Sequence, residues 1–174
     1  MNKTVLWQLL MFVLLLLLQV WLFNNIHLFG VATPFVYLYF TIKLPAKMNR
    51  NTVLLLSALL GLLIDLLGFT LGLNMSVMVI VGFLRFYLLK LFEPRDIYGD
   101  YVPSIETLGN PVFMRYAGVM TAIQVIILHL VESFAVFDPV QLLLRIVSSF
   151  ILTLLLIWGI ESCTTSLSER ESRH

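Results

Sequence analysis

Residues 61–74 read Gly-Leu-Leu-Ile-Asp-Leu-Leu-Gly-Phe-Thr-Leu-Gly-Leu-Asn and place a single carboxylate, Asp65, in an otherwise apolar stretch. On a helix that turns about 100° per residue, positions separated by steps of four, four, three and four share one narrow stripe. The small and acidic residues with this spacing are Ser57, Gly61, Asp65, Gly68 and Gly72. In a membrane helix, small residues permit close approach of another helix. We therefore predict a groove, closed by Asn74, that either packs inside the bundle or receives a partner's membrane helix.

The composition is that of a membrane protein. Of the 174 residues, 60% are hydrophobic and 12% are charged, and the mean hydropathy is +0.97. Apolar runs long enough to cross about 30 Å of hydrocarbon recur along the chain. The net charge of +1 gives no basic excess for binding nucleic acid. The lone cysteine, Cys163, excludes a disulfide framework within the chain.

Six segments are apolar enough to span a bilayer, which predicts an all-α integral membrane domain over residues 1–161 and a short polar cytoplasmic tail over 162–174. The first segment is too long for a secretory signal and has no small-residue cleavage site after it, so we expect it to be retained. The second contains Pro34 and is followed by Pro45, so its helix starts late or kinks. The six segments are 5–23, 28–44, 53–69, 75–92, 112–137 and 140–160.

Positive charge predicts the orientation, because Lys and Arg collect in alternate connections between the segments. With six spans, this places both termini in the cytoplasm. The tryptophans agree: Trp7 and Trp158 fall near the cytoplasmic interface and Trp21 near the outer one. The charges used are Lys3, Lys43, Lys47, Arg50, Lys90, Arg95, Arg115, Arg170 and Arg173.

Ionisable residues within the spans are candidate functional groups, since a charge at a helix centre costs about 2.5–3.5 kcal/mol on insertion. Asp65 lies roughly 6 Å from the outer end of the third span, and Arg85 lies roughly 15 Å into the fourth. Three roles are open for Asp65. It could pair with Arg85, cap the short hairpin over residues 70–74, or take part in proton or ion coupling.

A second pair is better matched in depth. Glu132 lies near the outer end of the fifth span, and Arg145 lies about one turn into the antiparallel sixth. We predict that they pair, either to hold the two helices together or to bind a partner or ligand. His129, three residues before Glu132, is expected to be a hydrogen-bonded packing residue.

Catalytic and metal motifs are not found in the sequence. It has no nucleophile with a base at a recognisable spacing, no zinc motif and no glycine-rich phosphate loop. The connections predicted on the outer side are also too short for a catalytic module. We expect no enzymatic activity, no cofactor and no metal.

Several short motifs, taken in order, resemble the MreD family, the small membrane subunit of the bacterial rod-shape-determining system. They are Pro34 at the start of the second span, the basic stretch 43–50, Gly-Leu-Leu-Ile-Asp at 61–65, Gly-Leu-Asn at 72–74 and Gly-Phe-Leu-Arg at 82–85. The resemblance is strongest over residues 28–90.

This resemblance implies a non-enzymatic protein of the bacterial inner membrane, embedded in the lipid bilayer. Such a protein works with MreC and, through MreC, with MreB, RodA and a penicillin-binding transpeptidase in the elongation complex for side-wall peptidoglycan synthesis.

The family's fold is similar to that of the substrate-binding subunits of energy-coupling-factor transporters. The alternative function is therefore a small-molecule-binding subunit of a vitamin-type transporter. Those subunits typically dock their partner through small residues on the first helix, and residues 14–18 offer none. A ligand site would need polar residues on the outer side, where the candidates are Asn24, Asn25, His27, Asn74, Glu132 and Asp138.

Overall fold

The computed structural model describes residues 3–23, 32–70, 72–93, 100–133 and 138–171. All the elements within these residues are helices. Four are long and apolar enough to cross a membrane, the last of them over Pro139–Thr165. This is the pattern of a multi-pass membrane protein. The four helices are α3 (Arg50–Gly68), α4 (Leu73–Phe92), α6 (Asn110–Glu132) and α7 (Pro139–Glu171).

Shorter helices complete the fold. The predicted first segment is helical as α1 (Lys3–Leu18), which continues into one π-helical turn, η1 (Gln19–Phe23). α2 (Leu38–Ile42) has five residues and α5 (Ile105–Leu108) has four. The side chain of Ser104 accepts a hydrogen bond from the Thr107 amide and so caps α5.

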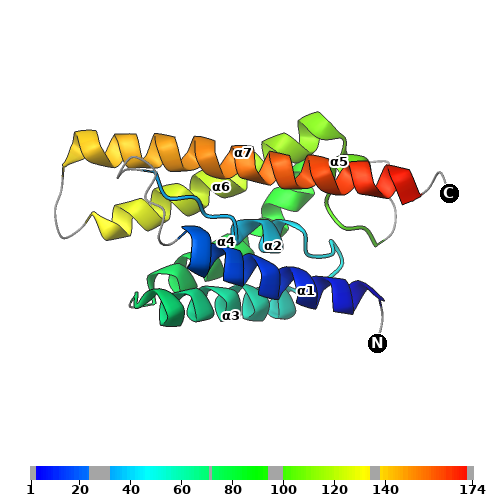
Figure 1. Ribbon diagram of the computed structural model, residues 1–174, viewed down its shortest axis with the longest axis horizontal. Coiled ribbons are helices and arrows are strands. Elements are labelled where there is room, and N and C mark those ends of the chain that lie inside the picture. The colour runs from blue at the N-terminus through cyan, green and yellow to red at the C-terminus, as the bar shows by residue number, and fades with distance from the viewer. Residues whose placement is uncertain (1–2, 24–31, 71, 94–99, 134–137, 172–174) are drawn as a thin grey trace.

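The long helices run along the long axis of the molecule, and α2 lies between them (Figure 1). α3 packs on α4, α4 on α6, and α6 on α7. The start of α1 and the end of α7 lie at one end of the bundle. The turn between α3 and α4, the end of α6 and the start of α7 lie at the other, which we call the hairpin end (Figure 1).

The predicted second span, 28–44, contains a helix that starts late, as expected from Pro34, but the helix is much shorter than predicted. Residues 28–31 lie outside the described residues. Residues 33–37 are not helical, only α2 follows, and the chain leaves α2 in a turn. Pro34 contributes to this, because proline lacks an N–H and fixes its own φ. We call residues 32–45 the broken segment.

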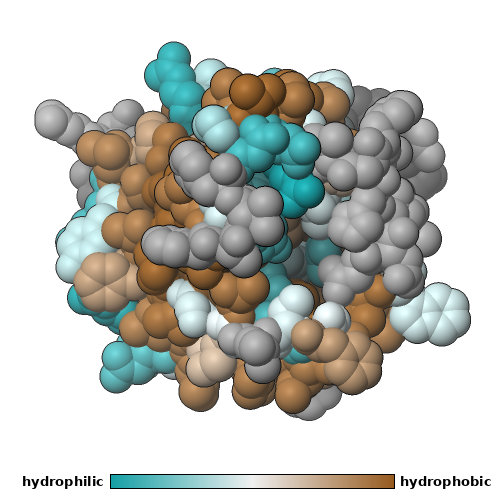
Figure 2. Space-filling model, turned by 90° about the vertical axis from the view of Figure 1, so that its left-hand side faces the viewer, coloured by the Kyte–Doolittle hydropathy of each residue, from teal (hydrophilic) through white to brown (hydrophobic). Residues whose placement is uncertain are grey.

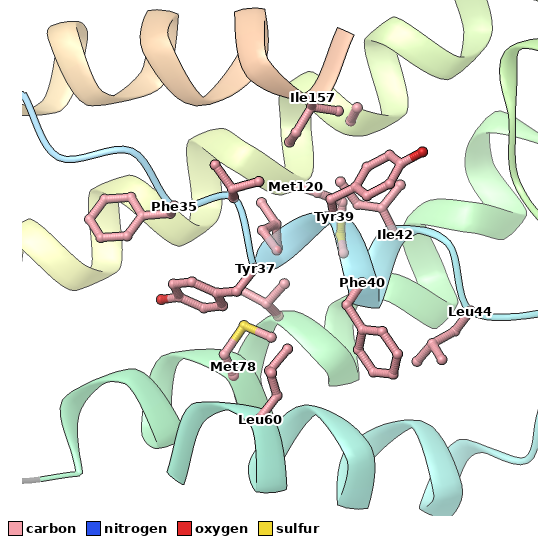
Figure 3. Close-up of a cluster of buried hydrophobic side chains, with 14 of the residues drawn as sticks. Phe35, Tyr37, Tyr39, Phe40, Ile42, Leu44, Leu60, Met78, Met120 and Ile157 are labelled. Atoms are coloured by element: carbon pink, nitrogen blue, oxygen red, sulfur yellow. The ribbon is translucent and has the colours of Figure 1, made fainter. Parts of the chain in front are cut away.

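The broken segment forms the centre of the hydrophobic core. Its side chains from Phe35 to Leu44 are all buried. Figure 3 shows six of them between α3 and α4 on one side and α6 and α7 on the other, with Leu60, Met78, Met120 and Ile157 around them. The six are Phe35, Tyr37, Tyr39, Phe40, Ile42 and Leu44. Irregular backbone is tolerated at membrane depth only where protein surrounds it. The segment therefore needs all the long helices in place.

The predicted ends of the last two spans also need correction. α6 ends at Glu132 rather than at 137, and residues 134–137 lie outside the described residues. α7 continues to Glu171, through most of the predicted tail. No glycine or proline interrupts residues 160–171. In addition, the hydroxyls of Thr164 and Thr165 bond to the carbonyls four residues earlier, which lets them stay within the helix.

The small-residue stripe packs inside the bundle. A Cβ added to Gly61 would lie 2.6 Å from the Cα of Met75 and 2.8 Å from the backbone oxygen of Asn74. A Cβ added to Gly82 on α4 would lie 2.9 Å from the Oγ of Ser57. The α3 and α4 backbones therefore approach closely at these positions. α4 occupies the part of the groove formed by Ser57 and Gly61, so a partner's helix has no room there.

Gly61→Ala is expected to lower the stability of the protein by about 1–3 kcal/mol. The alanine Cβ would clash with backbone atoms of α4, and these can move only if the whole helix shifts. The measurement is thermal unfolding in detergent. Gly159→Ala is the matched control, since a Cβ there meets nothing within 4 Å. Equal melting temperatures for Gly61→Ala and wild type would show that the close approach is not required.

Candidate functional site

Asp65 caps the first turn of α4. Its Oδ1 accepts hydrogen bonds from the Thr70 hydroxyl at 2.5 Å, the Asn74 amide N–H at 3.0 Å and the Asn74 side chain at 2.9 Å. Its Oδ2 accepts from the Met75 amide at 2.8 Å. Asp65 is 3% exposed. Among the three open roles, the structure shows the hairpin cap.

The hairpin itself depends on two left-handed residues. Phe69 has φ 53° and Gly72 has φ 73°, and glycine takes this conformation without steric cost. Gly68 and Gly72 are half-buried, so the stripe ends in the turn rather than in an open groove.

Arg85 caps the C-terminal end of α2 and does not pair with Asp65. Its Nε donates to the Thr41 carbonyl at 2.7 Å, and its Nη2 donates to the Leu44 carbonyl and to the Pro45 carbonyl at 3.5 Å. The side chain is 2% exposed. Carbonyls at the end of a helix lack intrahelical partners, and a cation there also interacts favourably with the helix dipole. Of the roles left open for Asp65, the pair with Arg85 is therefore not formed.

Side chains from other helices bond to the backbone at the start of the broken segment. Gln19 donates to the Pro34 carbonyl at 3.0 Å and accepts from the Val36 amide at 3.1 Å. The Phe35 amide donates to the Thr153 hydroxyl at 3.0 Å. Non-helical backbone is thus hydrogen-bonded in an apolar interior, where each unpaired group would be costly.

Glu161 is a buried ion-pair residue that the sequence did not single out. Its Oε1 accepts from Lys43 at 3.0 Å and from the Ile105 amide at 3.0 Å, and its Oε2 accepts from the Tyr39 hydroxyl at 2.5 Å. It is 1% exposed. One carboxylate therefore joins the broken segment, α5 and α7. The sequence did contain a clue. Glu161 directly follows the apolar run 140–160, and the predicted topology puts it on the same side of the membrane as the basic residues that follow the second segment.

His129 links α6 to α7 and to the broken segment. Its Nδ1 lies 3.0 Å from the Oε2 of Glu132, and its Nε2 lies 3.1 Å from the Oγ of Ser149. Ser149 also accepts from the Thr33 amide at 3.0 Å. Ser, His and carboxylate thus stand in the order used by hydrolases. Ser149 is fully buried, however, and its oxygen already bonds to backbone, so the geometry supports a structural role.

The predicted Glu132–Arg145 pair is not formed, because Glu132 contacts His129 instead. Within the part of the chain that the structure describes, the ion pairs are Lys43–Glu161 and His129–Glu132. Arg145 is exposed and has no carboxylate partner there. An i, i+3 contact on one helix competes with a contact between helices, and α6 brings His129 and Glu132 together locally.

A chain of polar side chains crosses the bundle from the hairpin. The Tyr37 hydroxyl donates to the Oδ1 of Asn74 at 2.7 Å and accepts from the side chain of Gln124 at 2.6 Å. Asn74 also bonds to Asp65. The α3–α4 hairpin, the broken segment and α6 are therefore connected.

Among the described residues, no group of three His, Cys, Asp or Glu side chains is placed to hold a metal.

The described part of the surface includes two hollows that bear on binding. One, of about 320 Å³, is at the hairpin end, where Figure 2 shows hydrophilic residues beside hydrophobic surface. It is lined by His129, Glu132, Ser133, Asp138, Gln141, Leu142 and Arg145. The other is an apolar groove of about 700 Å³ along α1, which we call the α1 groove. It is lined by Leu10, Val13, Leu14, Leu17, Leu18 and Trp21.

Comparison of the chain with protein-family models, with curated proteins and with solved structures gives no match.

Asp65→Asn is expected to lower the stability by about 1–3 kcal/mol. An amide has one acceptor oxygen, so its NH₂ would face one of the donors that the carboxylate now satisfies. Amide hydrogen exchange of residues 72–76 should accelerate, which mass spectrometry can measure. Glu106→Gln, an exposed carboxylate change on α5, is the control. Unchanged exchange at Asn74 and Met75 would contradict the capping role.

Arg85→Leu is expected to reduce the yield of folded protein strongly, since it leaves buried carbonyls of the broken segment without a donor. Folded yield is read by size-exclusion chromatography in detergent at equal expression. Arg115→Leu removes the same charge from an exposed position on α6 and is expected to leave the yield unchanged. Equal yields from the two variants would show that the cap is dispensable.

Proposed function

We propose that the chain is a non-enzymatic scaffold of the bacterial inner membrane. In this proposal it has six crossings with both termini in the cytoplasm and acts in the cell-shape and side-wall peptidoglycan elongation complex. It associates with MreC and, through MreC, with MreB, RodA and a penicillin-binding transpeptidase. The resemblance of residues 28–90 to the MreD family supports this assignment, as does the distribution of Lys and Arg.

The observation that carries the scaffold role is the use of the buried charges. Asp65, Arg85 and Glu161 are each exposed by 3% or less, and each bonds to the backbone of another element. A pump or transporter needs polar groups that change partners during its cycle. Here these groups hold α2, α4 and α5 in position, which suits a rigid platform for assembly.

The α1 groove is the surface that we propose for MreC. α4 fills the Ser57–Gly61 stripe, so a membrane helix of a partner must dock elsewhere. The residues of the groove include Leu14, which is 50% exposed, and Leu17, which is 53% exposed. Close van der Waals packing of such a surface against a partner's helix would supply the affinity, because lipid already solvates apolar side chains.

Co-purification with MreC from membranes tests the function and the surface separately. Wild type is expected to recover MreC, and the double change Leu14→Trp with Leu17→Trp is expected to reduce recovery several-fold by filling the groove. Leu143→Trp with Leu155→Trp, at exposed positions on α7, is the matched control.

Failure of wild type to recover MreC at equal expression would refute the proposed function. Recovery by the α1 double variant equal to that of wild type would leave the function standing and would reject the α1 groove as the contact.

A further inference from the structure

The cavity at the hairpin end is not needed for the proposed scaffold role, and its lining carries charges of both signs. It lies between the last turn of α6 and the first two turns of α7 and has a volume of about 320 Å³. Arg145 supplies a permanent positive charge, and Glu132 and Asp138 supply carboxylates. A cavity of this volume is large enough for a small polar group.

Arg145 is available to an anion. It is exposed, and within the described residues no carboxylate lies at ion-pair distance from it. Its guanidinium is planar and presents paired donors, which match the oxygens of a phosphate. The guanidinium of Arg145 is therefore free to bind a phosphate group.

Each carboxylate of the cavity uses one of its two oxygens in a hydrogen bond within the protein. Glu132 is 41% exposed and uses Oε2 to contact His129. Asp138 uses Oδ1 to accept from the amides of Val140 at 3.0 Å and Gln141 at 3.4 Å. In the described part of the chain, the second oxygen of each makes no hydrogen bond. Two fixed acceptors thus remain for the N–H groups of an ammonium ion.

The cavity lies near the start of α7, at or just below the depth expected for the headgroup layer. α7 has 33 residues, or about 50 Å at 1.5 Å per residue, against a hydrocarbon core of about 30 Å. Arg145 lies about 9 Å from the start of α7, and the headgroup layer is about 5–8 Å deep on each side. The outward face of α7 beside the cavity is apolar and exposed at Val140, Leu143 and Leu144.

We propose that the hairpin-end cavity binds the headgroup of phosphatidylethanolamine. Arg145 binds the phosphate, and Glu132 and Asp138 accept hydrogen bonds from the primary ammonium. The exposed apolar face of α7 lies against the acyl chains. A soluble zwitterion, such as O-phosphoethanolamine, has the same pair of charges but no acyl chains, so the α7 face favours the lipid.

Native mass spectrometry of the full chain, with one lipid added at a time, tests the proposal. Phosphatidylethanolamine is expected to be retained about tenfold better than phosphatidylcholine, whose quaternary ammonium has no N–H to donate. Phosphatidylglycerol, which lacks the cation, is also expected to bind more weakly. Equal retention of the three lipids would overturn the proposal.

Arg145→Gln is expected to reduce retention of phosphatidylethanolamine about tenfold, because the phosphate loses its guanidinium partner, and it removes no ion pair from the described structure. Arg115→Gln, which changes an exposed arginine at the opposite end of α6, should retain as much phosphatidylethanolamine as wild type. Retention of phosphatidylethanolamine by Arg145→Gln equal to that by wild type would reject the site.

A thermal-shift titration with O-phosphoethanolamine distinguishes binding of the lipid from binding of a soluble zwitterion. No shift is expected in the concentration range in which the lipid binds. A saturable shift that Arg145→Gln abolishes, without any lipid preference, would assign the cavity to a soluble zwitterion and overturn the lipid assignment.

Discussion

The structure depends on hydrogen bonding of the broken segment, a stretch of largely non-helical backbone in the middle of an apolar bundle. An unpaired N–H or C=O in such surroundings costs several kcal/mol. Gln19, Arg85 and Thr153, which come from three different helices, bond to this backbone. The packing of η1, α4 and α7 is therefore specified by polar contacts as well as by the fit of apolar side chains.

The buried charges follow the same logic. Asp65 lies at the N-terminal end of α4 and Arg85 at the C-terminal end of α2. These are the ends at which helix dipoles favour a negative and a positive charge, respectively. Each charge is thus stabilised by backbone groups rather than by the other, and both can be buried without forming a pair. The acidic motif is a structural device, and the α1 groove and the hairpin-end cavity are the surfaces that we propose for a partner's helix and for a lipid headgroup.

Much of the helical framework could be predicted from hydrophobic runs. The predicted spans 53–69 and 75–92 correspond to α3 and α4 within three residues at each end. The spacing of Ser57 and Gly61 predicted close approach of another helix, either within the bundle or from a partner, and the structure shows that this helix is α4. Pro34 indicated that the helix in 28–44 starts late, but the sequence did not show that it has only five residues. Composition measures how apolar a segment is and does not show where its backbone finds hydrogen-bond partners. Glu161 was missed for the same reason, since its partners Lys43 and Tyr39 are more than 100 residues away.

The sequence by itself determined that the chain is an all-helical membrane protein, that α3 and α4 form a tight hairpin, and that Asp65 stands at its turn. These features depend on local periodicity and on turn residues that are close in sequence. Only the tertiary structure decided that Arg85 binds the end of α2, that Glu132 contacts His129 and leaves Arg145 unpaired, and that the broken segment fills the core. The physical reason is that a buried polar group takes the partner that packing brings within about 3 Å, and hydrophobicity alone does not specify that partner.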